Sequence, residues 1–395
     1  MLGSAMHRQV FLLAVAQALF QSTGVLVVTI GGLAGSQISS PALATAPLGA
    51  MFLGNAVVTV PASLWMARVG RRTGFVTGAI LGTLGGLTAA GGVVTNSLIL
   101  LCLGTMLLGA YQAFALFYRF AASEVSDDAF RSRAISFVLT GGIVAAFLGP
   151  ALARWGEPML SPRYTGSFLL VAAVSLIAAL LLLRLRVPPP PAVSSDTKQR
   201  PLLEIVRQPA YLVALFGAAT GQGVMVLAMT ASPLAIVDHH HTVADASHAI
   251  QFHVLGMFLP SFFTGAIIAR FGLLSVMLAG VVLLATHVAL ALSGTALPYF
   301  ISALTFLGVG WNFLFIGSTT LLTQTYTPAE RGRAQAFNDF TVVIIGLLSS
   351  ASSGVFLAFL GWQKMNLILL PWLGLAAVAL IWFARRQRLA AAAFA

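Results

Sequence analysis

The sequence predicts an all-α integral membrane protein in which twelve transmembrane helices form two pseudo-symmetric six-helix bundles. Three observations support this fold class: the composition, the length of the apolar runs and a repeated pair of polar breaks. Hydrophobic residues make up 58% of the 395 residues and charged residues only 8%, against about 25% charged in ordinary soluble domains. A soluble fold could not cover its surface with so few charges, so much of the apolar surface must face lipid.

Two short motifs recur about two hundred residues apart, each as a polar break between long apolar runs. Ala67-Arg68-Val69-Gly70 matches Ala269-Arg270-Phe271-Gly272. Arg131-Ser132-Arg133-Ala134 matches Arg331-Gly332-Arg333-Ala334. Two matched breaks at nearly one offset indicate that the two halves share a plan. Parallel repeats of this kind build a substrate site between the halves of many transporters.

Twelve apolar segments are long enough to cross a bilayer core of about 30 Å, which takes about 20 helical residues. In the first half they cover 10–34, 43–66, 74–94, 97–119, 134–155 and 165–184. In the second half they cover 209–236, 249–270, 272–293, 297–323, 335–360 and 363–384.

A polar stretch between the sixth and seventh segments divides the chain. Residues 185–208 include four prolines at 188–191 and the polar run Ser194-Ser195-Asp196. Such a segment forms a stiff, extended spacer and buries too little surface to fold. We therefore expect residues 1–184 and 209–395 to be six-helix halves joined by a cytoplasmic linker.

The basic residues indicate the orientation in the membrane. Eighteen of the 21 lysines and arginines fall on the side that holds both termini, and Arg154, Arg163 and Lys364 fall on the other side. Basic loops stay in the cytoplasm, so we expect both termini to be cytoplasmic and the protein to lie in the inner (plasma) membrane. Topology also accounts for the net charge of +11 without a nucleic-acid partner. The single Cys102 forms no intrachain disulfide.

The loop between the second and third predicted spans resembles the signature loop of the major facilitator superfamily, Gly-x-Leu-Ala-Asp-Arg-x-Gly-Arg-Lys. Arg68, Gly70 and the basic pair Arg71-Arg72 match it, whereas Ala67 stands at the acidic position. The twelve spans, the duplication and the basic linker extend the resemblance over the whole chain. It implies a secondary transporter, not an enzyme, that works by alternating access on a small-molecule substrate without a cofactor. We expect a monomer in the lipid bilayer.

A second motif concerns the direction of transport. Gly149-Pro150 in the fifth span loosely fits a Gly-Pro motif of exporters that exchange substrate for protons, and we expect it to bend the helix. Proton-coupled drug exporters usually carry an arginine in span four, where this chain has Thr105. We expect proton-coupled export of a small amphipathic or weakly polar solute. The alternative is proton-coupled uptake of a nutrient such as a vitamin or organic acid.

Only one of the ten acidic residues falls within an apolar run. Asp339 follows Asn338 and lies six residues past Arg333, about 9 Å along a helix. A charge in a span costs at least about 2.5–3.5 kcal/mol at the helix centre, so it is a functional candidate. Three interpretations stay open: Asp339 carries a proton, it forms a latch with arginines of the signature loop, or it stabilises the start of its helix. His253 is a second proton-coupling candidate, with a packing role as the alternative.

Two further sets of residues are candidates for the gate and the cavity. Charged residues at span ends on the side of the termini are expected to form a cytoplasmic gate, although Arg119 could simply extend to the interface: Arg68, Arg71, Arg72, Arg119, Glu124, Arg270, Arg331 and Arg333. In the superfamily spans one, four, seven and ten line the cavity, so by resemblance their polar residues are substrate candidates, with helix packing as the alternative: Gln17, Gln21, Tyr111, Gln112, Gln222, Trp311 and Asn312.

A histidine-rich stretch suggests one alternative function, that of a metal-dependent enzyme. Asp238 and His239-His240-His241, with His248 nearby, have the composition of a metal site. Consecutive side chains point apart, however, and the spacing matches no zinc pattern. We therefore expect no metal here, and a membrane-embedded metal-dependent enzyme is the least favoured interpretation. No ATP-binding loop occurs in the sequence either.

Overall fold

The computed structural model describes residues 2–127, 130–187, 200–327 and 330–393, and these residues are helical almost throughout. The proline run at 188–191 and the polar run at 194–196 lie outside the described residues. Within the predicted linker, however, Leu202–Val206 forms a short helix, α9, whose Ile205 is fully buried. The end of the linker is therefore folded against the second half.

The described residues of the first half form eight α-helices and a short 3-10 helix, η1. These are α1 (Leu2–Ile38), η1 (Pro41–Leu43), α2 (Ala46–Val69), α3 (Arg71–Val94), α4 (Leu98–Ala115), α5 (Tyr118–Glu124), α6 (Arg131–Leu139), α7 (Gly141–Gly156) and α8 (Thr165–Leu182). After α9 the second half contains α10 (Pro209–Asp238), α11 (Val243–Phe258), α12 (Ser261–Phe271), α13 (Leu273–Ser293), α14 (Leu297–Thr323), α15 (Arg331–Leu367) and α16 (Leu369–Ala393).

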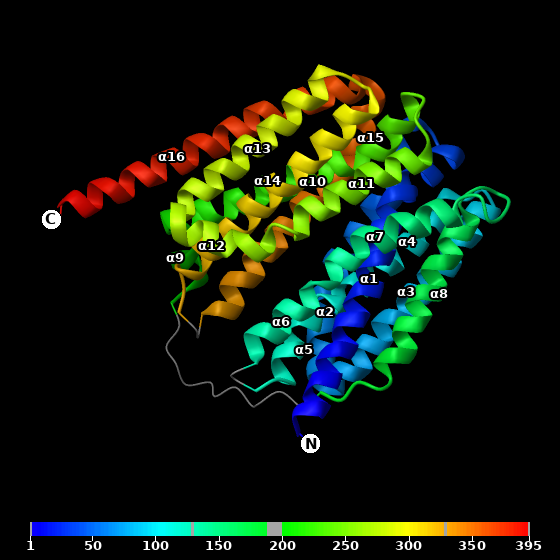
Figure 1. Ribbon diagram of the computed structural model, residues 1–395, viewed down its shortest axis with the longest axis horizontal. Coiled ribbons are helices and arrows are strands. Elements are labelled where there is room, and N and C mark those ends of the chain that lie inside the picture. Colours follow the sequence, from blue (N-terminus) through cyan, green and yellow to red (C-terminus); the bar gives the residue numbers. More distant parts are fainter. Residues whose placement is uncertain (1, 128–129, 188–199, 328–329, 394–395) are drawn as a thin grey trace.

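The described helices account for twelve crossings. Ten stretches are long and apolar enough to span a membrane, and the pair α11–α12, bent by 46°, makes an eleventh. One of the ten, Arg331–Leu389, has 59 residues, about three times the length that a bilayer core requires. It contains α15 and α16, which run in opposite directions after the break at Gly361 (φ 72°) (Figure 1). The twelve-helix fold class predicted from the sequence agrees with this arrangement.

Three predicted spans are interrupted, which the apolar runs did not indicate. Span four contains α4 and α5, span five contains α6 and α7 on either side of Thr140, and span eight contains α11 and α12, which meet at Leu259-Pro260 with a bend of 46°. The expected bend at Gly149-Pro150 is not the position of the break, because α7 continues through both residues. A Cβ at Gly149 would lie 2.7 Å from Val25 Cβ, so this glycine allows close packing of α7 on α1.

Glycine ends the second span of each half in the same way. Gly70 has φ 87° and ψ 159°, and Gly272 has φ 87° and ψ 149°. This region of backbone space is open essentially to glycine alone. The repeated motif in the sequence therefore corresponds to a repeated backbone turn, in which the next helix starts at the following residue.

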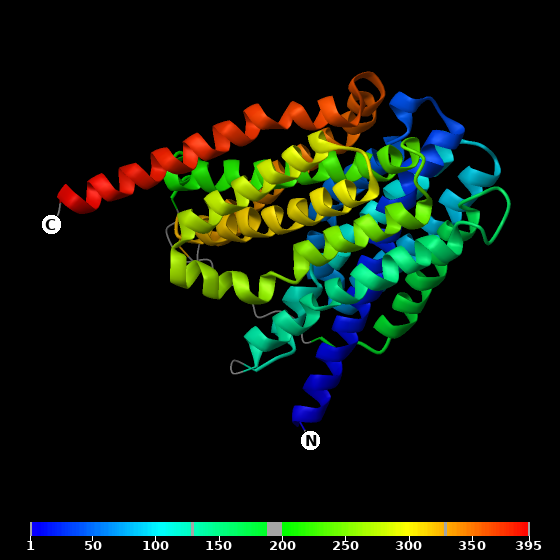
Figure 2. The ribbon, with the colours of Figure 1, turned by 45° about the horizontal axis from the view of Figure 1, so that its top comes forward.

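The helices of the two halves form two groups that approach each other at one end and diverge toward the end where both termini lie (Figures 1 and 2). We call these ends the far side and the terminus side. On the far side, Thr45 Oγ1 donates to Ser350 O (3.3 Å) and accepts from Gly354 N–H (3.0 Å). Between described residues, the hydrogen bonds that join α1–α8 to α10–α16 both lie here. The halves are thus in direct contact on the far side.

Candidate functional site

Gln222 lies at the partly exposed position of an otherwise buried stretch of α10. Between Gly217 and Ile236 it is the one residue that is not buried. Its Oε1 accepts a hydrogen bond from Trp311 Nε1 of α14 (3.2 Å). Gln222 and Trp311, two predicted substrate residues from different spans, therefore form one unit.

Trp311 also carries an aromatic neighbour. It stacks on Phe315, one turn further along α14, with 4.8 Å between ring centroids and 12° between the ring planes. Both rings are half-buried. Two nearly parallel rings next to an amide offer the mixture of apolar faces and placed polar groups that small-molecule sites use.

This unit lies where the halves meet. A Cβ built on Gly346 of α15 would be 3.6 Å from Gln222 Nε2 and 3.4 Å from the ring of Phe52 on α2. Phe52 belongs to the first half but packs against the core of both halves. Gln222, Trp311 and Phe315 thus face the region between the halves, where a transporter of this architecture binds its substrate.

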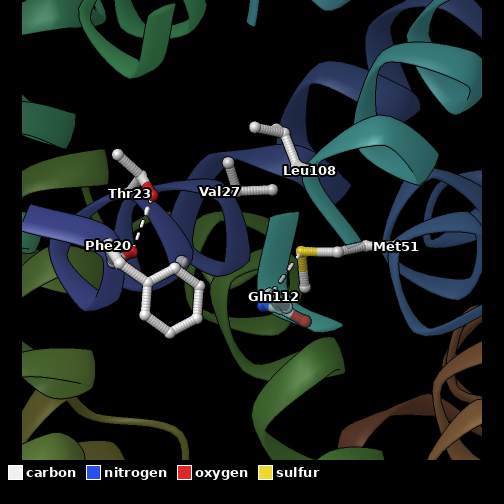
Figure 3. A pocket seen from close by; sticks show the side chains of 7 residues that line it. Phe20, Thr23, Val27, Met51, Leu108 and Gln112 are labelled. Carbon is white, nitrogen blue, oxygen red and sulfur yellow. Dashed lines mark hydrogen bonds between the residues drawn. The ribbon is translucent and has the colours of Figure 1, made fainter. Parts of the chain in front are cut away.

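The first half contributes a small pocket of about 10 Å³, room for one water molecule. Figure 3 shows Met51 of α2 and Gln112 of α4 pointing toward each other across it, with Phe20 and Thr23 on α1. Gln112 Nε2 lies 3.7 Å from Met51 Sδ, a weak contact for an amide donor. Met51 is the chain neighbour of Phe52, so this pocket adjoins the place where the halves meet.

Three predicted substrate residues are packed inside their own half. Gln17 is buried against Gly141 of α7. Tyr111 is fully buried, with its ring 5.2 Å from that of Phe20. Asn312 is fully buried and joins the interrupted span eight, because its side chain bonds Thr264 Oγ1, Met257 O and Ser261 Oγ. In this conformation these three residues pack between helices, which was the alternative to substrate binding. The sequence could not distinguish the two roles, because residue type alone does not determine which way a side chain faces.

Gln21 lies between the halves in a different way. Its Oε1 is buried and has no hydrogen-bond partner among the described residues. A Cβ atom built on Gly142 of α7 would lie 2.7 Å from this oxygen and 2.8 Å from the ring of Phe258 on α11. Gln21 therefore borders the contact of α7 with α11.

Asp339 is exposed on the terminus side of α15. Its carboxylate accepts a hydrogen bond from Asn338 Nδ2 (3.1 Å). It also interacts electrostatically with Arg119 of the first half, without forming an ion pair. Asn338 itself is buried, and its Oδ1 has no hydrogen-bond partner within the described ranges.

The arginines of the signature loop have other neighbours. Arg71 forms a two-pronged ion pair with Glu124 inside the first half, with a shortest distance of 2.7 Å. Arg68 and Arg72 are exposed, and Arg270 lies over the ring of Phe271. In this conformation the basic group that acts on Asp339 from the opposite half is Arg119, rather than an arginine of the loop.

The C-terminal loop residues form a second charged cluster. Glu330 accepts hydrogen bonds from Arg200 Nε (2.8 Å) and Nη2 (2.7 Å) and from Thr327 N–H (2.9 Å). Arg333 bonds the carbonyl of Arg200, and Arg331 bonds Gln335. These contacts fix the end of the linker to the start of α15.

Two of the candidate histidines, His253 and His241, are engaged in packing contacts. His253 is fully buried, with Nδ1 2.9 Å from Leu304 O of α14, so it faces the interior of the second half and not the region between the halves. His241 Nε2 lies 2.9 Å from Thr295 O. The part of the chain that the structure describes contains no group of three potential metal ligands.

Comparisons with known proteins identify the family. The model of the Major Facilitator Superfamily matches residues 4–246 and 216–393. The chain belongs to the major facilitator superfamily. It is therefore a multi-pass membrane protein of a transporter family, and such proteins are not enzymes.

Among its relatives, the riboflavin transporter RfnT of Brucella anthropi is 41% identical over 386 residues, which cover 96% of each chain. The uncharacterized MFS-type transporter YdeG of Bacillus subtilis is 28% identical and covers 92% of this chain and 89% of its own length. A point mutant of the nucleoside transporter NupG has a similar structure, with a TM-score of 0.75, 15% identity and coverage of 95% and 99%. The structure of a bacterial homolog of the human lysosomal transporter Spinster has a TM-score of 0.69 and 16% identity, and the match covers 96% of this chain and 97% of the homolog.

The prediction from sequence named residues with polar groups, including the aromatic Tyr111 and Trp311, and missed the purely apolar residues of the candidate site. Phe315, Phe52, Phe20 and Met51 complete its walls. The spacing of Trp311 and Phe315 by four residues places them on one helix face and was the available signal for this pair. For Phe52 no comparable signal exists, because apolar residues occur throughout these spans.

Proposed function

We propose that this protein imports riboflavin across the membrane. The proposal rests on the riboflavin transporter that is 41% identical over 96% of this chain. The alternative expected from the sequence, uptake of a nutrient such as a vitamin, is therefore preferred over export. A vitamin is consumed in the cytoplasm, which favours uptake as the direction.

The chemistry of the site supports such a substrate. Riboflavin has a flat, uncharged tricyclic ring system with carbonyl and N–H groups on one edge. Trp311 and Phe315 provide aromatic faces that suit stacking, and the amides of Gln222 and Gln112 provide uncharged donors and acceptors. No charged group is needed to bind this ring.

The expectation of export rested on the Gly149-Pro150 pair, and in the structure this pair has another role. The close approach of Gly149 to Val25 accounts for the glycine by helix packing alone. Small residues at helix contacts are common in membrane proteins of any transport direction. The pair therefore does not favour export.

We place the coupling step at Asp339. In alternating access the halves rock around the central site, so the terminus-side ends must approach each other when the far side opens. The Asp339 carboxylate and the Arg119 guanidinium, on opposite halves, attract each other in that approach. Uptake of one proton by Asp339 removes the attraction and favours separation of the terminus-side ends.

Uptake of radiolabelled riboflavin into proteoliposomes tests the proposal. With an inward proton gradient we expect accumulation above the equilibrium level, and collapse of the gradient should reduce uptake to equilibration. Sucrose in excess, which has no flat ring and no carbonyl, serves as the control competitor and should leave riboflavin uptake unchanged. Failure of the purified protein to move riboflavin in either direction would refute the function.

A further inference from the structure

The indole of Trp311 determines which way the Gln222 amide is turned. An indole N–H can only donate, and an amide offers an oxygen acceptor and an NH₂ donor. The 3.2 Å contact therefore requires Gln222 Oε1 to face Trp311. The usual ambiguity between the oxygen and nitrogen of a glutamine side chain is resolved by this one partner.

The NH₂ group of Gln222 consequently points away from Trp311, toward the region between the halves. Nε2 lies near Gly346 and the ring of Phe52. Among the described residues, the hydrogen bond of the Gln222 side chain is the one that Oε1 accepts from Trp311, and Nε2 donates none. The other residues of α10 from Gly217 to Ile236 are buried, whereas Gln222 is half-buried. Its oxygen already accepts a hydrogen bond and its NH₂ group is free to donate, so the side chain suits a ligand that carries a hydrogen-bond acceptor.

The neighbouring aromatic pair defines the shape of that ligand. The rings of Trp311 and Phe315 are nearly parallel, and Phe52 contributes a further ring on the opposite half. A flat ring system lies favourably against such surfaces. A carbonyl on its edge would then accept a hydrogen bond from Gln222 Nε2.

We propose that Trp311 is a positioning residue. The indole N–H can only donate, so it turns Gln222 Oε1 toward Trp311 and leaves the NH₂ group of Gln222 to donate to a ligand. The site therefore binds flat heteroaromatic rings that carry an edge carbonyl more tightly than rings of the same shape that lack one. This assignment rests on the proposed function, in which the ring carbonyls of riboflavin are the acceptors.

The test compares two ligands and two variants of the full-length protein. Riboflavin carries the edge carbonyls, and anthracene is a flat tricyclic ring without any hydrogen-bond acceptor. Gln222→Glu keeps an acceptor for Trp311 and removes the donor. Trp311→Phe keeps an aromatic ring and removes the N–H. Binding is measured by quenching of intrinsic and flavin fluorescence.

We expect Gln222→Glu to lower riboflavin affinity about tenfold, the size of one lost hydrogen bond with an acceptor left unpaired. Trp311→Phe should cause a smaller loss, because the amide can then turn either way. Anthracene affinity should stay at the wild-type level in Gln222→Glu. In Trp311→Phe it should fall less than riboflavin affinity, because anthracene loses only ring surface, and retained anthracene binding also shows that both variants fold. Trp382→Phe, at an exposed tryptophan of α16, is the matched control and should leave both affinities unchanged.

Three results would overturn the assignment. If wild type transports riboflavin and Gln222→Glu binds it equally well, the donor role is wrong while the proposed function stands. If Trp311→Phe weakens the binding of riboflavin and of anthracene equally, Trp311 acts as a surface and not as a positioning residue. If wild type neither binds nor moves riboflavin, the proposed function and this assignment both fail.

Discussion

At the residue scale, Asp339 combines two properties that a coupling group needs. It is exposed on the terminus side, where protons can reach it in this conformation. Among the described residues, the opposite charge with which it interacts is that of Arg119, on the other half. A change in its charge therefore changes the free energy of bringing the halves together at this side.

We predict that Asp339→Asn separates transport from the proton gradient. Exchange of labelled for unlabelled riboflavin should persist, whereas gradient-driven accumulation in proteoliposomes should fall at least tenfold, because the amide cannot take up the proton. Glu204→Gln, at an exposed carboxylate on α9, is the control and should accumulate riboflavin normally. Wild-type accumulation by Asp339→Asn would contradict the coupling role.

Glu330 gives a prediction for pH. The hydrogen bonds from Arg200, followed by the N–H of Thr327, hold the pKa of Glu330 well below its ordinary value of 4.5. A carboxylate with a lowered pKa in the folded state stabilises that state above its unfolded pKa, and the stabilisation disappears as the pH falls toward the folded pKa.

Glu330→Gln should therefore lower the Tm at pH 7, on the order of 2 °C. The difference from wild type should shrink as the pH falls below about 4.5. Thermal unfolding in detergent at a series of pH values measures this. The same difference at every pH would show that the charge of Glu330 is unimportant.

At the element scale, the two glycine turns are the clearest sign of duplication. Gly70 and Gly272 share a backbone conformation that a side chain disfavours by about 1–3 kcal/mol, and Cβ atoms there would meet little else. We predict that Gly70→Ala and Gly272→Ala each lower the Tm, and that the double variant shows nearly the sum because the two glycines lie in different halves and share no neighbour. Gly265→Ala, inside α12 with open space around it, is the control and should not lower the Tm.

The elements also show how far the sequence could predict this structure. Hydropathy located all twelve crossings, because lipid requires about 20 apolar residues for each. It could not locate the bend at Leu259-Pro260, because the apolar run continues through it and a tertiary contact, that of Asn312 with Met257 O, supplies a partner to the backbone there. The candidate site was predicted in part: Gln222 and Trp311 lie together, whereas Tyr111 and Asn312 face the interiors of their halves.

At the scale of the whole molecule, far-side contact and terminus-side separation define one end point of alternating access. Thr45 joins the halves through its hydroxyl, and a Cβ at Gly354 would lie 2.6 Å from Thr45 Oγ1. In a Cys102→Ala background, we predict that Thr45→Cys with Gly354→Cys forms a disulfide that stops riboflavin transport, and that a reductant restores it. Thr45→Cys alone should transport with or without oxidant. Full transport by the oxidised double variant would show that the far side need not open there.

The hydroxyl of Thr45 has a consequence for the environment in which the protein works. It exchanges hydrogen bonds with the carbonyl of Ser350 and the N–H of Gly354, and neither a hydroxyl nor a peptide group changes its charge between about pH 4 and pH 9. Acidity on the far side therefore leaves this closure as strong as it was. On the terminus side, by contrast, the Asp339 carboxylate that interacts with Arg119 can take up a proton, so the contacts at the two ends of the molecule differ in their response to acidity.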